Sequence, residues 1–425
     1  MASRVITVFE HERLVVGEAY GKDGVRFSEE HFNALVRYNE QHESRFFTVE
    51  HHKIKFTQHV GVIAVRGLTI EVLPKADGEG DEAKWQHALI DMLKVAHGLP
   101  LHEAGHARLA LRRTSVLEYF LRLFVDEVQR IVRQGLVKRY HGRIGVKNAL
   151  KGRLNLPQHI AGSIIHKERF HVVHQVYDTD HLLHAILKKA LKIVEDVTRD
   201  PITMGLAQDV GWAFETVQER RISGKVFDKL VLDRKTGGYA DALQLARLIL
   251  LNYAPDIRGG REHILSLLFD MNRLFEVVVL KLLQRATNAH PELTVTGQNS
   301  REFWNGQRIR PDILVTRDGC PELIIDTKWK LPKDGRPADA DLKQMYAYNL
   351  QFGAVRSMLL YPGHERNDMP HTDFVRGAVV DHHHGCALRY VELFDSDGRI
   401  WKDAGAALLK RCMDREKPSA THHHP

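Results

Sequence analysis

The sequence predicts an α/β protein whose last third contains a mixed β-sheet flanked by helices, preceded by a β-rich N-terminal unit and a mainly helical middle region. Three observations lead to this prediction. Apolar and polar residues alternate near the N-terminus, as they do in half-buried strands. Apolar residues then recur at three- and four-residue spacing, which is typical of helices with one buried face. The last third returns to strand-like apolar runs, with a helix between two of them.

The N-terminal unit is predicted to span residues 1–76. Alternation is clearest over residues 4–17 and 55–73, which indicates strands. One helix is expected near Glu29–Tyr38. The acidic, glycine-rich stretch Asp77–Asp81 then predicts a linker, because it has no apolar residue to bury.

The middle region, residues 82–255, is predicted to be mainly α-helical, with its strongest amphipathic pattern running from Ser115 to Val132. An irregular connector with no acidic residue interrupts the helices. Such a segment is usually a solvated charged face, but it can also follow a phosphate backbone or contact a protein partner. Further helices are expected at residues 85–96, 181–197 and 239–251. The basic residues of the connector are Lys138, Arg139, Arg143, Lys147, Lys151 and Arg153.

Residues 256–410 are predicted to form the α/β domain, followed by a flexible tail at residues 411–425. The domain is expected to begin with one long apolar helix, His263–Ala286. The strand-like runs lie at residues 308–315, 322–329 and 355–361, and a helix is expected at residues 339–350 between the last two. This order indicates a mixed sheet.

Composition excludes several classes of protein. The 425 residues include 61 Lys and Arg against 54 Asp and Glu, a net charge of +7 that is compatible with a nucleic-acid partner. Three cysteines without a CxxC pair exclude a disulfide framework and a cysteine-based zinc site. No apolar run approaches the roughly 18 residues of a membrane span, and the N-terminus does not resemble a signal peptide. We therefore expect a soluble, cytoplasmic protein. The P-loop motif GxxxxGK[ST] is also missing from the sequence, so GTP or ATP hydrolysis would have to be performed by a partner.

Two acids and a lysine are expected to converge within the α/β domain. Asp312 stands at the start of one apolar strand, and Asp326 and Lys328 stand at the end of the next. Side chains alternate along a strand, so Asp326 and Lys328 share a face. The turn-rich TRDGCP between the strands predicts a hairpin that would place Asp312 beside Asp326. A structural salt bridge at a strand end is the alternative interpretation.

Such charges are costly to bury unless a cation compensates them. Asp312, Asp326 and the Thr327 carbonyl would offer the oxygen ligands that Mg²⁺ prefers. A metal there can polarise a phosphodiester and lower the pKa of a water. Lys328 could orient or deprotonate that water, or stabilise charge on the phosphate. The predicted chemistry is Mg²⁺-dependent phosphodiester hydrolysis.

Three flanking residues are further candidates. Glu276 lies in the apolar run LFEVVVLKLL, where a third contact to metal or water would explain it. A solvated position or an ion pair with Lys281 or Arg273 would explain it equally well. Gln344 and Tyr348 are four residues apart on one helix face and could reach a phosphate or the lysine, or could simply be helix surface.

These motifs resemble those of a known nuclease family. Pro311-Asp312 followed by Asp326-Thr327-Lys328 is the pattern of the PD-(D/E)xK superfamily, and Gln344 and Tyr348 have the spacing of the QxxxY motif in its RecB-like branch. Three longer blocks resemble the McrC family, the nuclease subunits of McrBC 5-methylcytosine-dependent restriction systems. They are GLTIEVLPK (Gly67–Lys75), LKGRLNLPQHI (Leu150–Ile160) and IIDTKWK (Ile324–Lys330).

The resemblance implies a division of labour. McrC proteins bind a hexameric AAA+ GTPase, McrB, through their N-terminal part and stimulate its GTP hydrolysis, while McrB recognises the methylated DNA. The C-terminal domain cuts double-stranded DNA with Mg²⁺, which makes Asp312, Asp326 and Lys328 catalytic, together with Glu276, Gln344 and Tyr348 on looser matches. A stand-alone RecB-like nuclease and a non-catalytic activator of the GTPase are the alternatives.

Overall fold

The computed structural model describes residues 4–21, 23–75, 81–99, 115–162, 169–255, 263–332, 335–375 and 383–414. The chain divides into two compact units. The first unit consists mainly of Leu117–Leu267, and the second combines Val5–Ile63, Leu68–Val116 and Leu268–Pro425. The N-terminal strands and the C-terminal α/β region thus lie in the same unit. The three-domain division at residues 76, 82 and 256 stays a prediction, and the proposed linker Asp77–Asp81 lies outside the described residues except for Asp81.

The N-terminal part of the second unit is β-rich, as predicted. Its one helix, α1, begins after Ser28, whose side chain accepts a hydrogen bond from the backbone N–H of His31. Strands β1, β8 and β7 are neighbours in one sheet, and β2, β6 and β5 form a second sheet. Their inward-facing residues are aliphatic and aromatic and are fully buried. The elements are β1 (Arg4–Phe9), β2 (Arg13–Val15), β3 (Ala19–Tyr20), β4 (Val25–Arg26), α1 (Glu29–Gln41), β5 (Phe47–Glu50), β6 (Lys53–Phe56), β7 (His59–Val65) and β8 (Leu68–Leu73).

The first unit consists of helices and a small sheet. Helix α4 is amphipathic, and Leu121, Phe124 and Val128 on its apolar face are fully buried. Helix α6 packs against α7 and α9. The elements are α4 (Val116–Gln134), β9 (Arg139–Lys147), β10 (Arg153–Leu154), α5 (Leu156–Gly162), β11 (Phe170–Asp178), α6 (Leu182–Val197), α7 (Pro201–Gly211), the 3₁₀ turn η1 (Trp212–Phe214), α8 (Gly224–Asp228), η2 (Gly237–Tyr239), α9 (Ala240–Leu251) and β12 (Tyr253–Pro255).

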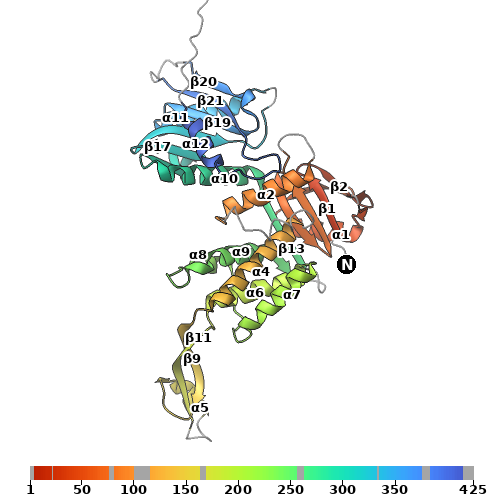
Figure 1. The fold of residues 1–425 in the computed structure, drawn as a ribbon, viewed down its shortest axis with the longest axis vertical. Helices are drawn as coiled ribbons and strands as arrows, with labels where there is room; N and C mark the ends of the chain where they lie inside the picture. Colours follow the sequence, from red (N-terminus) through yellow and green to blue (C-terminus); the bar gives the residue numbers. More distant parts are fainter. Residues whose placement is uncertain are drawn as a thin grey trace, which may run out of the picture. The chain divides into compact units, whose positions relative to one another are not determined.

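The basic connector is not irregular, so this part of the prediction was wrong. Strand β9 pairs antiparallel with β11 over nine residue pairs, from Arg139 opposite Asp178 to Lys147 opposite Phe170. With β10, the two strands form a three-stranded arm that extends from the helices of this unit (Figure 1). The signal for a strand was the period-two alternation of Tyr140, Ile144 and Val146 with polar residues. The high charge of the segment concealed it.

The prediction of one helix over His263–Ala286 was also wrong for the first part of this range. His263–Asp270 is strand β13, which pairs antiparallel with β12, and only Met271–Ala286 forms helix α10. The Asp270 side chain caps the helix by accepting a hydrogen bond from the backbone N–H of Arg273, at 3.1 Å. Short apolar runs fit a strand and a buried helix equally well by periodicity, so this cap was the available signal.

The second unit contains the predicted mixed sheet, with strand order β14-β17-β18-β19-β21-β20. Strands β17 and β18 are antiparallel, whereas β18, β19 and β21 run parallel. Helix α11 joins β18 to β19 and packs on the sheet through Met345, Tyr348 and Phe352, which share a buried cluster with Ile324 and Leu359. Helix α10 packs against α2 and α12. The elements are α2 (Glu82–Ala96), β14 (Leu293–Gly297), β17 (Ile313–Arg317), β18 (Cys320–Thr327), α11 (Asp339–Phe352), β19 (Arg356–Pro362), β20 (Met369–Asp373), β21 (Gly385–Val391) and α12 (Ala404–Met413).

The strand predicted at residues 308–315 is two strands. A short hairpin of β15 (Arg301–Trp304) and β16 (Gln307–Ile309) ends before Pro311, and β17 begins after Asp312. Proline has no backbone N–H to donate, which favours a break at this point. Asp312 therefore lies in the connection that leads into the central sheet.

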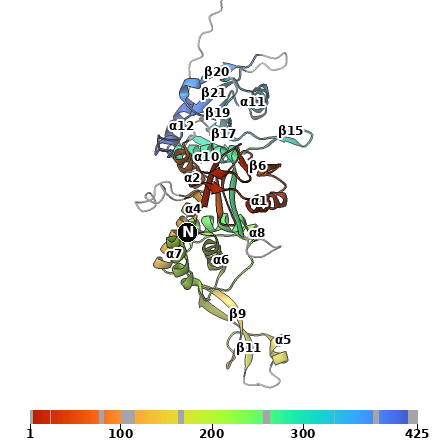
Figure 2. The ribbon, with the colours of Figure 1, turned by 90° about the vertical axis from the view of Figure 1, so that its right-hand side faces the viewer.

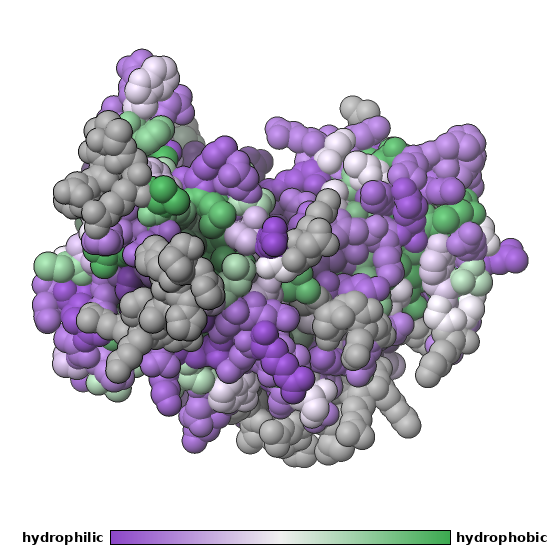
Figure 3. Space-filling view, turned by 90° about the horizontal axis from the view of Figure 1, so that it is seen from above, coloured by the Kyte–Doolittle hydropathy of each residue, from purple (hydrophilic) through white to green (hydrophobic). Residues whose placement is uncertain are grey.

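The described residues contain no helix that is long and apolar enough to cross a membrane. The face of the molecule drawn in Figure 3 is mainly hydrophilic, with small hydrophobic areas between the polar ones.

Candidate active site

The β17–β18 hairpin brings the two predicted aspartates to the same end of the sheet. Its register pairs Ile313 with Ile325, so the next position of each strand places Asp312 opposite Asp326. Asp312 is held in place by β18 itself. Its Oδ2 accepts hydrogen bonds from the backbone N–H and the hydroxyl of Thr327, both at 2.8 Å. One oxygen of Asp312 is thus used for positioning, which leaves Oδ1 for other contacts.

Asp326 is a buried carboxyl that lies close to the negative charge of Asp312. Its residue surface is only 4% exposed. Burial raises the pKa of Asp326 to about 6, the Asp312 charge adds to this rise, and Lys328 opposes it. Carboxyl groups whose pKa is raised in this way are common in functional sites, where like charges are held close together.

Lys328 completes the cluster as a firmly charged ammonium. Its Nζ lies 2.9 Å from Asp326 Oδ2 and 2.9 Å from Asp341 Oδ1. Burial works to lower the pKa of Lys328, but these carboxylates outweigh it and hold the pKa above its usual range. The ammonium therefore stays protonated, which favours charge stabilisation over proton abstraction. Sequence reasoning missed Asp341, since an acid in the first turn of a helix needs no partner to be explained.

Glu276 of α10 lies within electrostatic reach of the pair. Burial raises its pKa, and the charge of Asp312 raises it further. The Gln298 side-chain amide donates a hydrogen bond to Glu276 Oε1, and the Gln298 backbone N–H donates to Asp312 O at 2.9 Å. Gln298 has a φ of +59°, a conformation uncommon for a residue with a side chain. Gln298 thus connects Glu276 to the strand start at Asp312, a role that no local sequence pattern indicated.

Gln344 and Tyr348 form one hydrogen-bonded pair on α11. The Gln344 amide donates to the Tyr348 hydroxyl at 2.7 Å, and that hydroxyl donates to the Arg310 carbonyl at 2.9 Å. Burial raises the pKa of Tyr348, and the Asp326 and Asp312 charges raise it further, so the phenol stays protonated. In this structure the pair fixes the chain two residues before Asp312. Contact of either residue with a phosphate stays a prediction.

The donor set fits a hard divalent cation with few protein ligands. No group of three or more His, Cys, Asp and Glu side chains with metal-binding geometry occurs among the described residues. Asp326 Oδ2 is buried and pairs with the Lys328 ammonium at 2.9 Å. This oxygen, the Asp312 carboxylate and the Thr327 carbonyl are oxygen donors of the kind that Mg²⁺ accepts, with water supplying the remainder.

Trp329, the residue directly after Lys328, is held by contacts with residues that are distant in the sequence. Trp329 is buried between the rings of Trp85 and Phe275, and its indole N–H donates to Glu10 Oε1 at 2.7 Å. The same Glu10 oxygen accepts a hydrogen bond from the backbone N–H of Lys75, at 3.0 Å. The N-terminal strands thus help to hold the residue that follows Lys328. Glu10 had no sequence signal, because its partners are distant along the chain.

The predicted basic residues lie on the arm of the first unit. Arg139, Arg143 and Lys147 are on β9, and Lys138, Lys151 and Arg153 lie beside it or on β10. Arg139 pairs with Asp233 at 3.1 Å.

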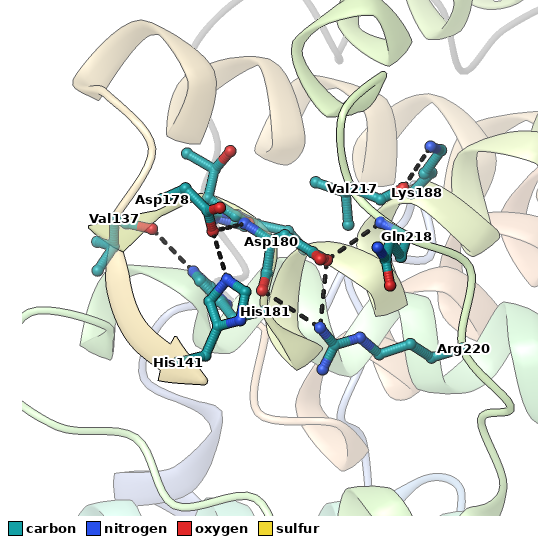
Figure 4. A network of polar contacts seen from close by, with 11 residues as sticks. Val137, His141, Asp178, Asp180, His181, Lys188, Val217, Gln218 and Arg220 are labelled. Carbon is teal, nitrogen blue, oxygen red and sulfur yellow. Dashed lines mark hydrogen bonds and ion pairs between the residues drawn. The ribbon is translucent and has the colours of Figure 1, made fainter. Parts of the chain in front are cut away.

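Polar contacts fix the base of the arm, as Figure 4 shows. His141 Nε2 lies 2.8 Å from Asp178 Oδ1, which joins β9 to β11. His181 Nε2 lies 2.8 Å from the carbonyl of Val137, the residue that leads into β9. The arm is therefore anchored at its base, where β9 begins and β11 ends.

Comparison with known proteins gives the family. The model of the McrBC 5-methylcytosine restriction system component family matches residues 54–362. No curated protein matches the chain.

Two solved structures share the fold. A chain of the refined half-complex from the tetradecameric assembly of Thermococcus gammatolerans McrB AAA+ hexamers with bound McrC has a TM-score of 0.69 at 18% identity, covering 96% of this chain and 98% of its own. A chain of the Thermococcus gammatolerans McrBC complex has a TM-score of 0.51 at 21% identity, covering 66% of this chain and 88% of its own. Since the family model covers well over half of the sequence, the chain belongs to the McrBC 5-methylcytosine restriction system component family.

Proposed function

We propose that this chain is the endonuclease subunit of a modification-dependent restriction complex that cuts DNA next to sites containing 5-methylcytosine. The observation that carries the proposal is the convergence of Asp312, Asp326 and Lys328 at one end of the β17–β18 hairpin. A merely structural salt bridge would not need a second carboxylate close enough to raise the pKa of Asp326.

The residues divide the chemistry among themselves. Asp312, Asp326 and the Thr327 carbonyl would hold Mg²⁺, which supplies polarisation of the phosphodiester and activation of water. Lys328, kept protonated by Asp326 and Asp341, places a positive charge where the phosphate gains negative charge. Two hydrogen bonds position the neighbouring residues. Gln298 holds the Glu276 carboxyl, and Tyr348 holds the chain at Arg310, just before Asp312.

The partner we propose is a McrB-like AAA+ GTPase hexamer, whose GTP hydrolysis this chain stimulates. The chain has no P-loop sequence of its own. One structural relative, which covers 96% of this chain, comes from an assembly of McrB AAA+ hexamers with bound McrC. In this proposal the partner recognises the methylated base, and the chain supplies the nuclease.

The experiment that tests the proposal is reconstitution. Methylated and unmethylated duplex DNA is incubated with the chain, with or without the GTPase, GTP and Mg²⁺. We expect double-strand cleavage only of methylated DNA and only with all components. Cleavage without partner and nucleotide would instead identify a stand-alone nuclease. Stimulated GTP hydrolysis without any cleavage would identify a non-catalytic activator.

The arm of the first unit is proposed to contact the GTPase. Its basic residues are interleaved with Tyr140, Ile144 and Val146, which are all exposed, and exposed aliphatic side chains, which have no ring to place against a base, favour a protein interface over a phosphate track. Ile144→Asp is expected to weaken GTPase stimulation about tenfold or more, because it buries a charge in that interface.

GTP hydrolysis measured against subunit concentration checks this prediction. Val231→Asp is the matched control, because Val231 is exposed in the same unit but outside the arm. If Ile144→Asp left stimulation unchanged, or Arg143→Ala weakened only DNA binding, the arm would be a phosphate track.

A further inference from the structure

The second unit carries a hairpin, β15–β16, with two large exposed aromatic side chains. Phe303 is 57% exposed and Trp304 is 68% exposed. Covering the solvent-facing area of such rings favours binding in proportion to the area removed from water. Figure 2 shows β15 extending away from the central strands of its unit. Adjacent exposed aromatics on a projecting hairpin are therefore a candidate contact surface.

The hairpin is also cationic. Arg301, Arg308 and Arg310 are exposed, whereas Glu302 is the one acid between residues 300 and 310. Glu302 is partly engaged, since its Oε1 accepts a hydrogen bond from the backbone N–H of Gly306 at 3.0 Å. Arginines near exposed aromatic rings on one hairpin can contact phosphates while the rings enter a groove.

The hairpin is a rigid element. Its turn is Asn305-Gly306, and both residues have positive φ, at +37° and +80°. Two hydrogen bonds attach β15 to α11. Arg301 donates to the Gln351 carbonyl at 2.9 Å, and the Gln351 side chain donates to the Glu302 carbonyl at 2.8 Å.

The hairpin leads directly into the candidate catalytic residues. After Arg310 come Pro311 and Asp312, and the Arg310 carbonyl accepts the hydrogen bond of the Tyr348 hydroxyl. Trp304 is eight residues from Asp312, so at about 3.3 Å per residue it lies within about 26 Å of that carboxylate. This is less than the roughly 34 Å of one DNA turn, so one duplex can meet both.

We propose that the β15–β16 hairpin is a DNA-binding element that holds the duplex for cleavage, with its arginines on phosphates and Trp304 in a groove against the bases. This inference rests on the proposed function and adds to it the surface that positions the substrate. Charge complementarity selects DNA over a protein occupant. The hairpin and Arg310, which follows it, carry three arginines against one hydrogen-bonded acid, and the aromatics near its tip can enter a groove of the same duplex.

The experiment measures binding separately from cleavage. Wild type and variants carrying an additional Asp326→Asn are titrated onto a fluorescent duplex at several salt concentrations, with partner and GTP. Trp304→Ala is expected to raise the Kd for DNA about tenfold, because it removes an apolar contact in the groove. Arg310→Gln is expected to lower the slope of log K against log salt by about one. Trp212→Ala is the matched control, because Trp212 is 71% exposed but lies in the first unit.

The outcomes separate the two proposals. A higher Kd for DNA in Trp304→Ala, with unchanged GTPase stimulation and melting temperature, supports the hairpin as a DNA contact. Unchanged DNA binding overturns it, and a loss confined to GTPase stimulation would make the hairpin a protein contact instead. Failure of the wild type to cut DNA in the complete reaction would contradict the proposed function, whatever the hairpin variants do.

Discussion

Replacing Asp326 with alanine is expected to reduce DNA cleavage about 10³-fold while leaving GTPase stimulation intact. The carboxylate lies in the centre of the cluster, between Asp312 and the Lys328 ammonium. Its loss would remove a ligand of the proposed metal, a contact worth several kcal/mol in the transition state, and would leave Lys328 with Asp341 alone. Cleavage is measured as the initial rate of linearisation of methylated plasmid with partner, GTP and Mg²⁺.

Asp339→Ala is the matched control for this prediction. Asp339 lies at the start of α11, close in sequence to Asp341, but its side chain is largely exposed and pairs only with Lys343 on the surface. Such pairs contribute little, so this variant is expected to cut like the wild type. The proposed division of labour would be refuted if Asp326→Ala, folded and monodisperse, lost cleavage and GTPase stimulation together. Full cleavage by the variant would remove Asp326 from the mechanism.

The second large effect concerns stability and pH. Burial and the Asp312 charge raise the pKa of Asp326 to about 6 from its ordinary value of 3.8. The folded state therefore binds this proton more tightly than the unfolded state does, so the stabilisation is complete below about pH 4 and is lost as the pH rises through 6. Without Mg²⁺ at pH 8, the free energy of unfolding of Asp326→Asn should be about 3 kcal/mol higher than that of the wild type. This value follows from the pKa difference between about 6 and 3.8, at about 1.4 kcal/mol per pKa unit. The gain should vanish near pH 4.

Urea unfolding at pH 4, 6 and 8 measures this difference, with Asp339→Asn as the control that should not change. Addition of Mg²⁺ at pH 8 should raise the melting temperature of the wild type and not that of Asp326→Asn, because a ligand that binds only the folded state stabilises it. If the difference in unfolding free energy between the wild type and Asp326→Asn did not change with pH, ionisation of Asp326 would not destabilise the folded state. An equal Mg²⁺ response in both proteins would place the metal elsewhere.

The core of the site could be predicted because its signals are local. Asp312, Asp326 and Lys328 lie within one hairpin, where the alternation of side chains and a turn-rich connection decide which groups meet. The parallel pairing of β18 with β19 through α11 likewise followed from the order of strand, helix and strand. The family blocks around Gly67 and Lys330 agree with the matched family.

The errors occurred where local patterns were ambiguous. Strand β9 has the alternation of a strand but the charge of a loop, and it exists because β11, which begins more than twenty residues later, supplies its hydrogen bonds. Strand β13 was assigned to a helix because an apolar run alone does not distinguish the two. For β9 a partner strand distant along the chain decided the conformation.

By itself the sequence determined that a hairpin would bring Asp312 beside Asp326 and Lys328, since this depends on neighbours a few residues apart. Only the tertiary structure decided how these residues are held and charged. Asp341 at the lysine, Gln298 between Glu276 and Asp312, and Glu10 beneath Trp329 all arrive from other elements of the fold. Their contribution depends on burial and on distances across the folded chain, and those quantities exist only once the elements have packed.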